Sequence, residues 1–153
     1  MIEKRWFKRS SVILITAAIA GVLIWSYCLQ PSVSRAFEQA SRKEIYPMTL
    51  HGKPFDMPYR LSVPEDAGSG RSYPLFLWLC GSAQCGTDNV KQAVYDVGLV
   101  DELVEMKDDD YRCIIIAPQI PTEALATDDE LLAGYMGLVE QVQRQYGADA
   151  GRL

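Results

Sequence analysis

Four cysteines and one histidine are the residues of this 153-residue chain best suited to metal or nucleophilic chemistry. Cys80 and Cys85 have the spacing C-x4-C, but no second Cys/His pair completes a tetrahedral zinc site. A metal site is therefore not expected. The two cysteines flank a short loop, and they either remain buried free thiols or are joined by a disulfide in an oxidising compartment. The spacing leaves both possibilities open.

Cysteine catalysis is not favoured by the residues around these thiols. Ala83-Gln84-Cys85-Gly86 and Cys80-Gly81-Ser82 share only fragments with cysteine-protease motifs, and the histidine spacing does not match. The one histidine, His51, lies in a predicted turn, where we expect it to be exposed. The acidic tracts 108–110 and 128–130 are typical of a solvated loop and of a helix start, not of a catalytic carboxylate pair.

The N-terminal region has the features of a membrane-targeting signal. Val12 to Leu29 is an apolar run that would span roughly 27 Å as a helix, close to the hydrocarbon thickness of a membrane. Basic residues precede it, and Trp25 and Tyr27 lie near its far end, as the positive-inside rule and the aromatic belt require for export of the rest of the chain. We expect a membrane-anchored domain on the periplasmic or extracellular side.

Three other interpretations of this run remain open. The small residues Ser32 and Ser34 offer a cleavage site, which would make residues 1–34 a signal peptide and the domain a secreted one. Lipid modification of Cys28 is a second alternative. A buried helix of a soluble domain is the third.

Charge divides the chain and excludes one class of partner. Residues 1–34 carry four basic and one acidic residue, and the remainder carries eleven basic and nineteen acidic residues. Nucleic-acid binding is not expected, because phosphate neutralisation needs clustered Lys and Arg. We expect residues 35–44 to form a linker or short helix and 45–153 to form one folded domain.

The folded part alternates strand and helix patterns. Strands are predicted at Ile45–Leu50 and Phe55–Val63, joined by a turn at 51–54. The continuous apolar runs at 73–80 and 112–117 are typical of central parallel strands, which are covered on both faces. Between them a helix is predicted over Val90–Met106.

A last helix is predicted to begin at a capping box of Thr127 and Glu130 and to end at Gly147. Its apolar face recurs at helical spacing: Leu131, Tyr135, Leu138, Val139, Val142 and Tyr146. Hairpin, strand, helix, strand and helix in this order predict a doubly wound α/β fold. Asp149 to Leu153 resembles the turn into a further central strand, so the predicted sheet is unfinished.

Five segments from about Met57 onward carry a family resemblance: Met57–Pro64, Tyr73–Leu79, Gly81-x4-Gly86-Thr-Asp-Asn89, Ile114–Gln119 and Tyr146–Asp149 with Arg152-Leu153. In their order and spacing, over about 97 residues, the chain resembles the carboxylesterase and feruloyl-esterase-like branch of the α/β-hydrolase superfamily. The resemblance implies the N-terminal half of a hydrolase sheet.

The resemblance also implies an oxyanion role for the loop after the strand at 74–80. Gly81 corresponds to the turn glycine and Ser82 to the residue whose backbone N–H faces the developing oxyanion. Cys80 departs from the family, which has His at this position. Thr87 and Asp88 are expected to fix the loop by hydrogen bonds.

The catalytic triad is missing from the sequence. A serine hydrolase of this kind needs G-x-S-x-G and then an acid and a histidine, but no G-x-S-x-G occurs and His51 lies upstream. We therefore expect an exported serine ester hydrolase represented by its N-terminal half, inactive as given and without cofactor. The alternatives are a membrane-anchored, non-catalytic binding module and one half of a split hydrolase.

Overall fold

The computed structural model describes residues 35–95, 97–106, 108–121, 128–149 and 151. All of them belong to one of two units into which the chain divides, residues 34–153. None of the helices within the described residues is long and apolar enough to cross a membrane. The run Val12–Leu29 lies outside the described residues, so its membrane role stays a prediction.

The predicted hairpin is present and is longer than expected. Strand β1 spans Arg42–Leu50 and β2 spans Lys53–Ser62, and the two are antiparallel. The turn consists of only His51 and Gly52, with φ values of 52° and 71°. Two consecutive positive φ angles are what a two-residue hairpin turn needs for its twist to match that of the strands. Pro54 therefore belongs to β2, not to the turn.

The segment 35–44, expected as a linker or short helix, belongs to the fold. Helix α2 spans Ala36–Ala40, and its Phe37 side chain is fully buried. The Phe37 N–H donates to Oδ1 of the buried Asp101 at 2.8 Å. Buried Arg60 on β2 donates to the Glu38 carbonyl at 2.6 Å. These bonds hold α2 against the rest of the domain. The polar composition of the segment gives no sign of such contacts, so the sequence predicted a linker or short helix.

The sheet is mixed and confirms the predicted parallel pair. Strand β3 spans Leu75–Leu77 and β4 spans Ile114–Pro118, and the strand order is β1-β2-β4-β3. Strands β3 and β4 are parallel, whereas β2 and β4 are antiparallel. The strand predicted over 73–80 is shorter because β3 is an edge strand that pairs only with β4.

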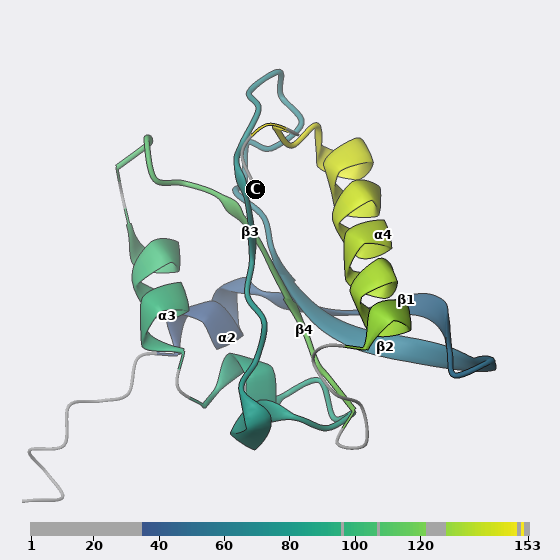
Figure 1. Cartoon of the computed structure of the whole chain (residues 1–153). Helices are drawn as coiled ribbons and strands as arrows, with labels where there is room; N and C mark the ends of the chain where they lie inside the picture. The colour runs from purple at the N-terminus through teal and green to yellow at the C-terminus, as the bar shows by residue number, and fades with distance from the viewer. Residues whose placement is uncertain (1–34, 96, 107, 122–127, 150, 152–153) are drawn as a thin grey trace, which may run out of the picture. The chain divides into compact units, whose positions relative to one another are not determined.

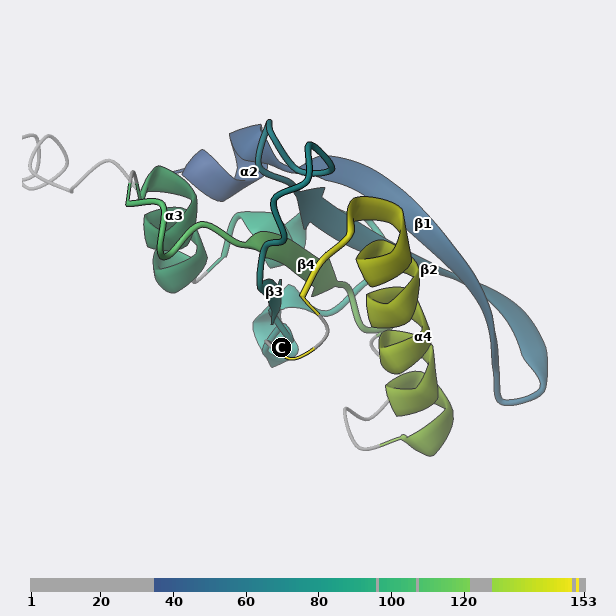
Figure 2. The same ribbon diagram turned by 90° about the horizontal axis from the view of Figure 1, so that it is seen from above.

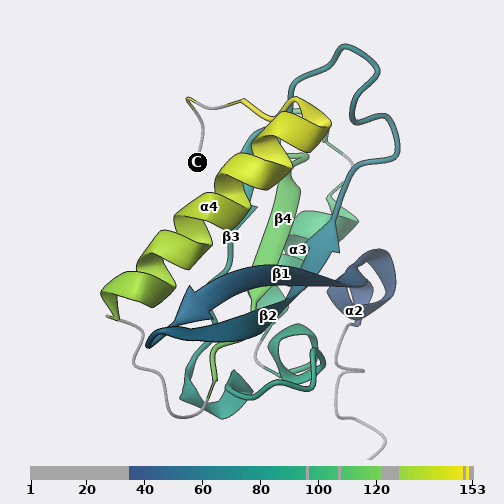
Figure 3. The ribbon, with the colours of Figure 1, turned by 90° about the vertical axis from the view of Figure 1, so that its right-hand side faces the viewer.

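Helices cover both faces of this sheet. Helix α4 (Asp129–Tyr146) lies on one face, and α2 and α3 (Gly98–Glu105) lie on the other (Figures 1 and 3). Strand β4 is buried throughout, and its successive side chains point alternately to the two faces of the sheet. Ile114 and Ile116 join the core under α4, while Ile115 and Ala117 join the core under α3. A strand with two buried faces has no polar face, which explains its continuous apolar run.

The helix predicted over Val90–Met106 is only partly present. A single 3-10 turn spans Lys91–Ala93, and α3 begins at Gly98. The Asp88 carboxylate accepts from the N–H groups of Val90 and Lys91, and the buried Gln92 side chain donates to Asn89 Oδ1. Polar side chains that bond to nearby backbone compete with a continuous helix, and they win here.

The last helix has the predicted apolar face and C-terminus but a different N-cap. Asp128 is the N-cap, because its side chain accepts from the N–H groups of Glu130 and Leu131. The predicted capping box with Thr127 is therefore wrong, and Thr127 itself lies outside the described residues. Gly147 ends the helix with φ 63°, a left-handed conformation suited to glycine.

Asp128 also joins α4 to the hairpin, which curves past this helix (Figure 2). His51 Nε2 lies 2.6 Å from Asp128 Oδ2, and the His51 N–H donates to Glu130 Oε2 at 2.5 Å. The hydrogen bond and charge of Asp128 raise the pKa of His51, and His51 lowers the pKa of Asp128. His51 is exposed, as predicted. Its bond to Asp128, the N-cap of α4, was not predicted from the sequence.

Replacing His51 with glutamine is expected to change stability in a pH-dependent way. Because the pKa of His51 is raised on folding, the His51–Asp128 pair contributes its full stabilisation below about pH 6.5. This stabilisation is lost as the pH rises through the pKa that His51 has in the folded protein. The lowered pKa of Asp128 gives stability present above about pH 4 and lost as the pH falls through its folded value. Urea unfolding of both proteins should show the largest difference near pH 5. A difference independent of pH would contradict this ion pair.

Candidate functional site

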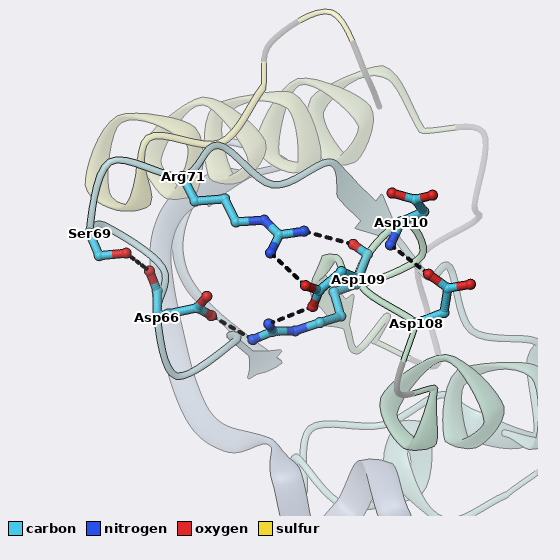
Figure 4. Close-up of polar contacts among 7 residues, drawn as sticks. Asp66, Ser69, Arg71, Asp108, Asp109 and Asp110 are labelled. Atoms are coloured by element: carbon cyan, nitrogen blue, oxygen red, sulfur yellow. Dashed lines mark hydrogen bonds and ion pairs between the residues drawn. The ribbon is translucent and has the colours of Figure 1, made fainter.

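Two polar clusters lie at opposite ends of the parallel strands β3 and β4. At the amino ends, Arg112 binds Asp66 at 2.5 Å and Asp109 at 3.1 Å, and Arg71 binds Asp109 at 3.2 Å (Figure 4). Both guanidinium groups lie over the Tyr73 ring, 5.0 and 5.3 Å from its centroid. This ion-pair cluster joins the loop before β3 to the loop before β4.

The ion-pair cluster is a structural element and not the candidate site. Hydrogen bonds from Arg112 and then Arg71 lower the pKa of Asp109, so its carboxylate stays ionised beside them. The two arginines and two aspartates balance in charge, which leaves no free cation for an anionic ligand. In open α/β sheets, ligands bind outside the carboxyl ends of the strands, which is the other end. The acidic tract 108–110 is exposed, as predicted, although Asp109 is paired.

The predicted oxyanion residues lie at the carboxyl end of β3. Gly81 is extended, with φ −77° and ψ 173°, and Ser82–Gln84 form a 3-10 turn closed by the Gln84 N–H bond to the Gly81 carbonyl at 2.9 Å. Gly81, Ser82 and Ala83 are exposed. Among the described residues, none accepts a hydrogen bond from the Ser82 N–H. A short turn that begins with an unpaired N–H has the donor that an oxyanion hole requires.

The Gln84 side chain occupies the first N–H of this segment, that of Gly81. It is only 3% exposed, and its Oε1 accepts from the Gly81 N–H at 2.7 Å. Its Nε2 donates to the Tyr95 carbonyl, which anchors the turn to the segment before α3. The Gly81 donor is thus occupied, and the Ser82 donor is available.

A second buried amide holds the same loop from β4. Gln119, which follows the last residue of β4, is fully buried. Its Nε2 donates to the Gln84 carbonyl at 3.1 Å and to Asp88 Oδ1 at 2.9 Å, and its Oε1 accepts from the Asn89 N–H at 2.7 Å. Hydrogen bonds through backbone and side chains thus connect five residues, which we call the amide network: Gln84, Asp88, Asn89, Gln92 and Gln119.

The amide network was missed by sequence reasoning, apart from Asp88. Asp88 has the loop-fixing role that was predicted: its carboxylate binds Gln119 and two backbone N–H groups, and its pKa is lowered, first of all by the Gln119 amide. A sequence signal for Gln119 did exist. A glutamine directly after a wholly apolar strand is a polar group in a buried place, and it needs partners.

Replacing Gly86 with alanine is expected to destabilise the domain by about 2 kcal/mol. Gly86 has φ 147°, a region that side chains rarely adopt, and an added Cβ would lie 3.2 Å from Nε2 of Gln119. Urea unfolding measures the effect. The matched control is Gly98→Ala, whose Cβ would meet nothing within 4 Å. Equal stability of the two variants would contradict the close contact with Gln119.

Neither a histidine base nor a triad nucleophile is assembled at this loop by the described residues. His51 is bonded to Asp128 and Glu130 at the hairpin tip. Cys80 is 8% exposed, and burial raises the pKa of its thiol. The described residues contain no group of His, Cys, Asp and Glu side chains placed to hold a metal ion. The 80–86 loop therefore offers backbone donors without triad residues.

The fold is similar to that of an esterase. A solved structure described as a thermostable esterase matches with a TM-score of 0.54 and 25% sequence identity, over 72% of this chain and 32% of the esterase chain. This chain thus spans about a third of the length of that esterase. No protein-family model and no curated protein matches the chain. The similarity supports a hydrolase-like fold, a mixed α/β sheet with few helices.

Proposed function

We propose that the chain is the N-terminal part of an exported serine ester hydrolase and supplies its oxyanion loop. The observation that carries the proposal is the free Ser82 N–H at the carboxyl end of β3, in a sheet similar to that of an esterase. The finer assignment to the carboxylesterase and feruloyl-esterase-like branch is part of the same proposal.

The proposed reaction is acyl transfer through an acyl-enzyme. When a serine attacks an ester carbonyl, the carbonyl oxygen gains negative charge, and a preorganised N–H stabilises it. Ser82 would give that hydrogen bond, and Gly81 would give the turn its shape. The nucleophile, the acid and the base would come from residues outside this chain, and no cofactor is needed.

The open edge of the sheet supports a partner strand beside β3. Strand β3 is at the edge, and a groove of about 450 Å³ next to it is lined by apolar side chains including Leu75, Phe76 and Tyr111. After α4, the Asp149 N–H donates to the Tyr73 carbonyl at 2.9 Å. This bond places residue 149 beside the segment that leads into β3, and a further parallel strand would add at the free edge of β3.

Export is the second part of the proposal. The apolar run 12–29 with basic residues before it would anchor the protein in a membrane, with the domain on the periplasmic or extracellular side. Cleavage of the run would release a secreted domain instead. The proposed substrate is an ester, small or polymeric.

The esterase proposal is tested by expressing the gene with the reading frame that follows codon 153, beside residues 1–153. The longer product is expected to hydrolyse p-nitrophenyl acetate and to lose this activity with a serine-reactive phosphonate, whereas residues 1–153 show no such turnover. An intact longer product with G-x-S-x-G and no esterase activity would contradict the proposal. Phosphonate-sensitive turnover by residues 1–153 would contradict the location of the nucleophile.

A non-catalytic accessory module is the second candidate. The observation that favours it is the core on both faces of the sheet, which gives residues 35–149 a buried interior of their own. A reading frame that ends at Leu153, together with one cooperative thermal transition of the full chain, would support this module over the hydrolase. A product that aggregates or behaves as a molten globule would contradict it.

A further inference from the structure

Cys80 and Cys85 enclose the turn that carries the candidate oxyanion donor. Cys80 precedes Gly81, and Cys85 follows Gln84 directly. The backbone between them is compact, because the Cys85 N–H bonds to the Ser82 carbonyl at 3.3 Å and the Cys85 thiol lies 3.7 Å from the Gly81 carbonyl oxygen. The two ends of the turn are thereby brought close together.

Both thiols lie on the same face of the sheet and next to each other. Cys85 packs against the core under α4 that includes Cys80. Burial raises the pKa of Cys80, and the neighbouring Cys85 thiol raises it further. Tyr135 on α4 belongs to the same core, and its hydroxyl is buried without a hydrogen-bond partner among the described residues. Both thiols are free in this structure.

We propose that Cys80 and Cys85 are a disulfide-forming pair that fixes the turn 81–84. The reaction is thiol–disulfide exchange with a low-molecular-weight disulfide such as glutathione disulfide. The Cys85 thiolate, on the more exposed of the two residues, attacks one sulfur of the donor, whose S–S bond breaks and releases one glutathione. The Cys80 thiolate then attacks the Cys85 sulfur and releases the second glutathione. Two cysteine thiols are oxidised, one donor disulfide is reduced, and the two protons pass to the leaving thiolates.

The bridge would hold the turn in its observed conformation. A ring closed by Cys80 and Cys85 keeps the Gly81 and Gln84 backbone in contact, and so keeps the Ser82 N–H unpaired. The value of this constraint for catalysis rests on the proposed oxyanion function, but the bridge itself does not. An oxidising compartment, which the N-terminal run predicts, is where such a bridge would persist.

Cys113 gives an internal control. It packs against the core under α3, on the face of the sheet opposite to Cys80 and Cys85. Burial raises the pKa of Cys113 to about 11, so its thiol is largely protonated at neutral pH. The Cys113 thiol should therefore react slowly with glutathione disulfide, and it should not form a disulfide with Cys80 or Cys85.

The experiment incubates the full chain, purified in detergent, with equal concentrations of oxidised and reduced glutathione. Trypsin cleaves after Arg71 and Lys91, so both cysteines fall in one peptide, 72–91, and Cys113 falls in another. The peptide 72–91 is expected to be about 2 Da lighter and to resist alkylation until dithiothreitol is added. The thermal midpoint should rise by about 5–10 °C and return on reduction.

Matched variants decide the outcome. Cys80→Ser and Cys85→Ser should lose the mass change and the thermal shift, while Cys113→Ser keeps both. Stable glutathione on Cys85 with a free Cys80, or a bridge to Cys113 or between molecules, would overturn the proposal. Because no readout depends on ester hydrolysis, failure of the bridge and failure of the esterase proposal are told apart.

Discussion

Replacing Ser82 with proline is expected to lower the kcat of the proposed hydrolase about 100- to 1,000-fold without unfolding the domain. Proline has no N–H, so the substitution removes the proposed oxyanion donor and leaves the rest of the turn in place. The measurement is ester hydrolysis by the gene product that carries the nucleophile.

The local backbone accepts proline at this position. Ser82 is the first residue of a 3-10 turn, where φ is close to the value that the proline ring fixes. Gly81 before it is extended, at φ −77° and ψ 173°, which is the conformation preferred ahead of proline. Among the described residues no acceptor is lost, because the Ser82 N–H has none. The thermal midpoint of Ser82→Pro should therefore stay close to that of the parent chain.

Ser82→Ala is the matched control, because it removes the hydroxyl and keeps the N–H. It is expected to retain nearly full activity. If Ser82→Pro were as active as Ser82→Ala, Ser82 would not be the oxyanion donor. If both lost activity, the side chain and not the backbone would be responsible.

Replacing Gln119 with leucine is expected to lower the free energy of unfolding by about 3 kcal/mol. The side chain is fully buried and makes three hydrogen bonds, to Gln84, Asp88 and Asn89. Leucine has a similar volume but no polar atoms, so the buried Asn89 N–H and Gln84 carbonyl would be left without partners. Unsatisfied buried groups of this kind carry most of the cost.

Urea unfolding measures this loss, with Gln39→Leu as the control. Gln39 lies exposed on α2, and the same chemical change there should alter stability by less than about 0.5 kcal/mol. Loss of Gln119 should also raise the pKa of Asp88, whose lowered value comes first from the Gln119 amide. Two-dimensional NMR titration of the Asp88 carboxyl gives that second readout. Equal stability of the two variants would show that the amide network does not hold the loop.

The hairpin, the parallel pair and the last helix could be predicted from local patterns. The apolar runs before Cys80 and before Pro118 have no polar face, and the structure buries β4 on both sides for that reason. The apolar residues of α4 recur at helical spacing, and five of the six are buried. Periodicity reports which face of an element meets a core, because hydrophobicity is a property of the side chain itself and its spacing can be seen in the sequence.

Strand lengths and helix starts depended on partners that lie far away in the chain. Strand β3 is short because its pairing is limited to β4, whose residues lie about 40 positions later in the chain. The N-cap of α4 is Asp128, whose carboxylate also binds His51 from the hairpin. Local propensity has no access to these long-range contacts.

The sequence by itself determined the class of fold, the position of the candidate loop and the missing triad. The resemblance placed Gly81 and Ser82, and the single histidine upstream excluded a complete Ser–His–acid set within these residues. The tertiary structure alone decided that Gln84 occupies the Gly81 N–H and leaves the Ser82 N–H unpaired. It also brought Gln119 to the loop and Cys85 beside Cys80. The physical reason is that a backbone donor has the same chemistry at every residue, and only the surrounding acceptors decide which donor remains free.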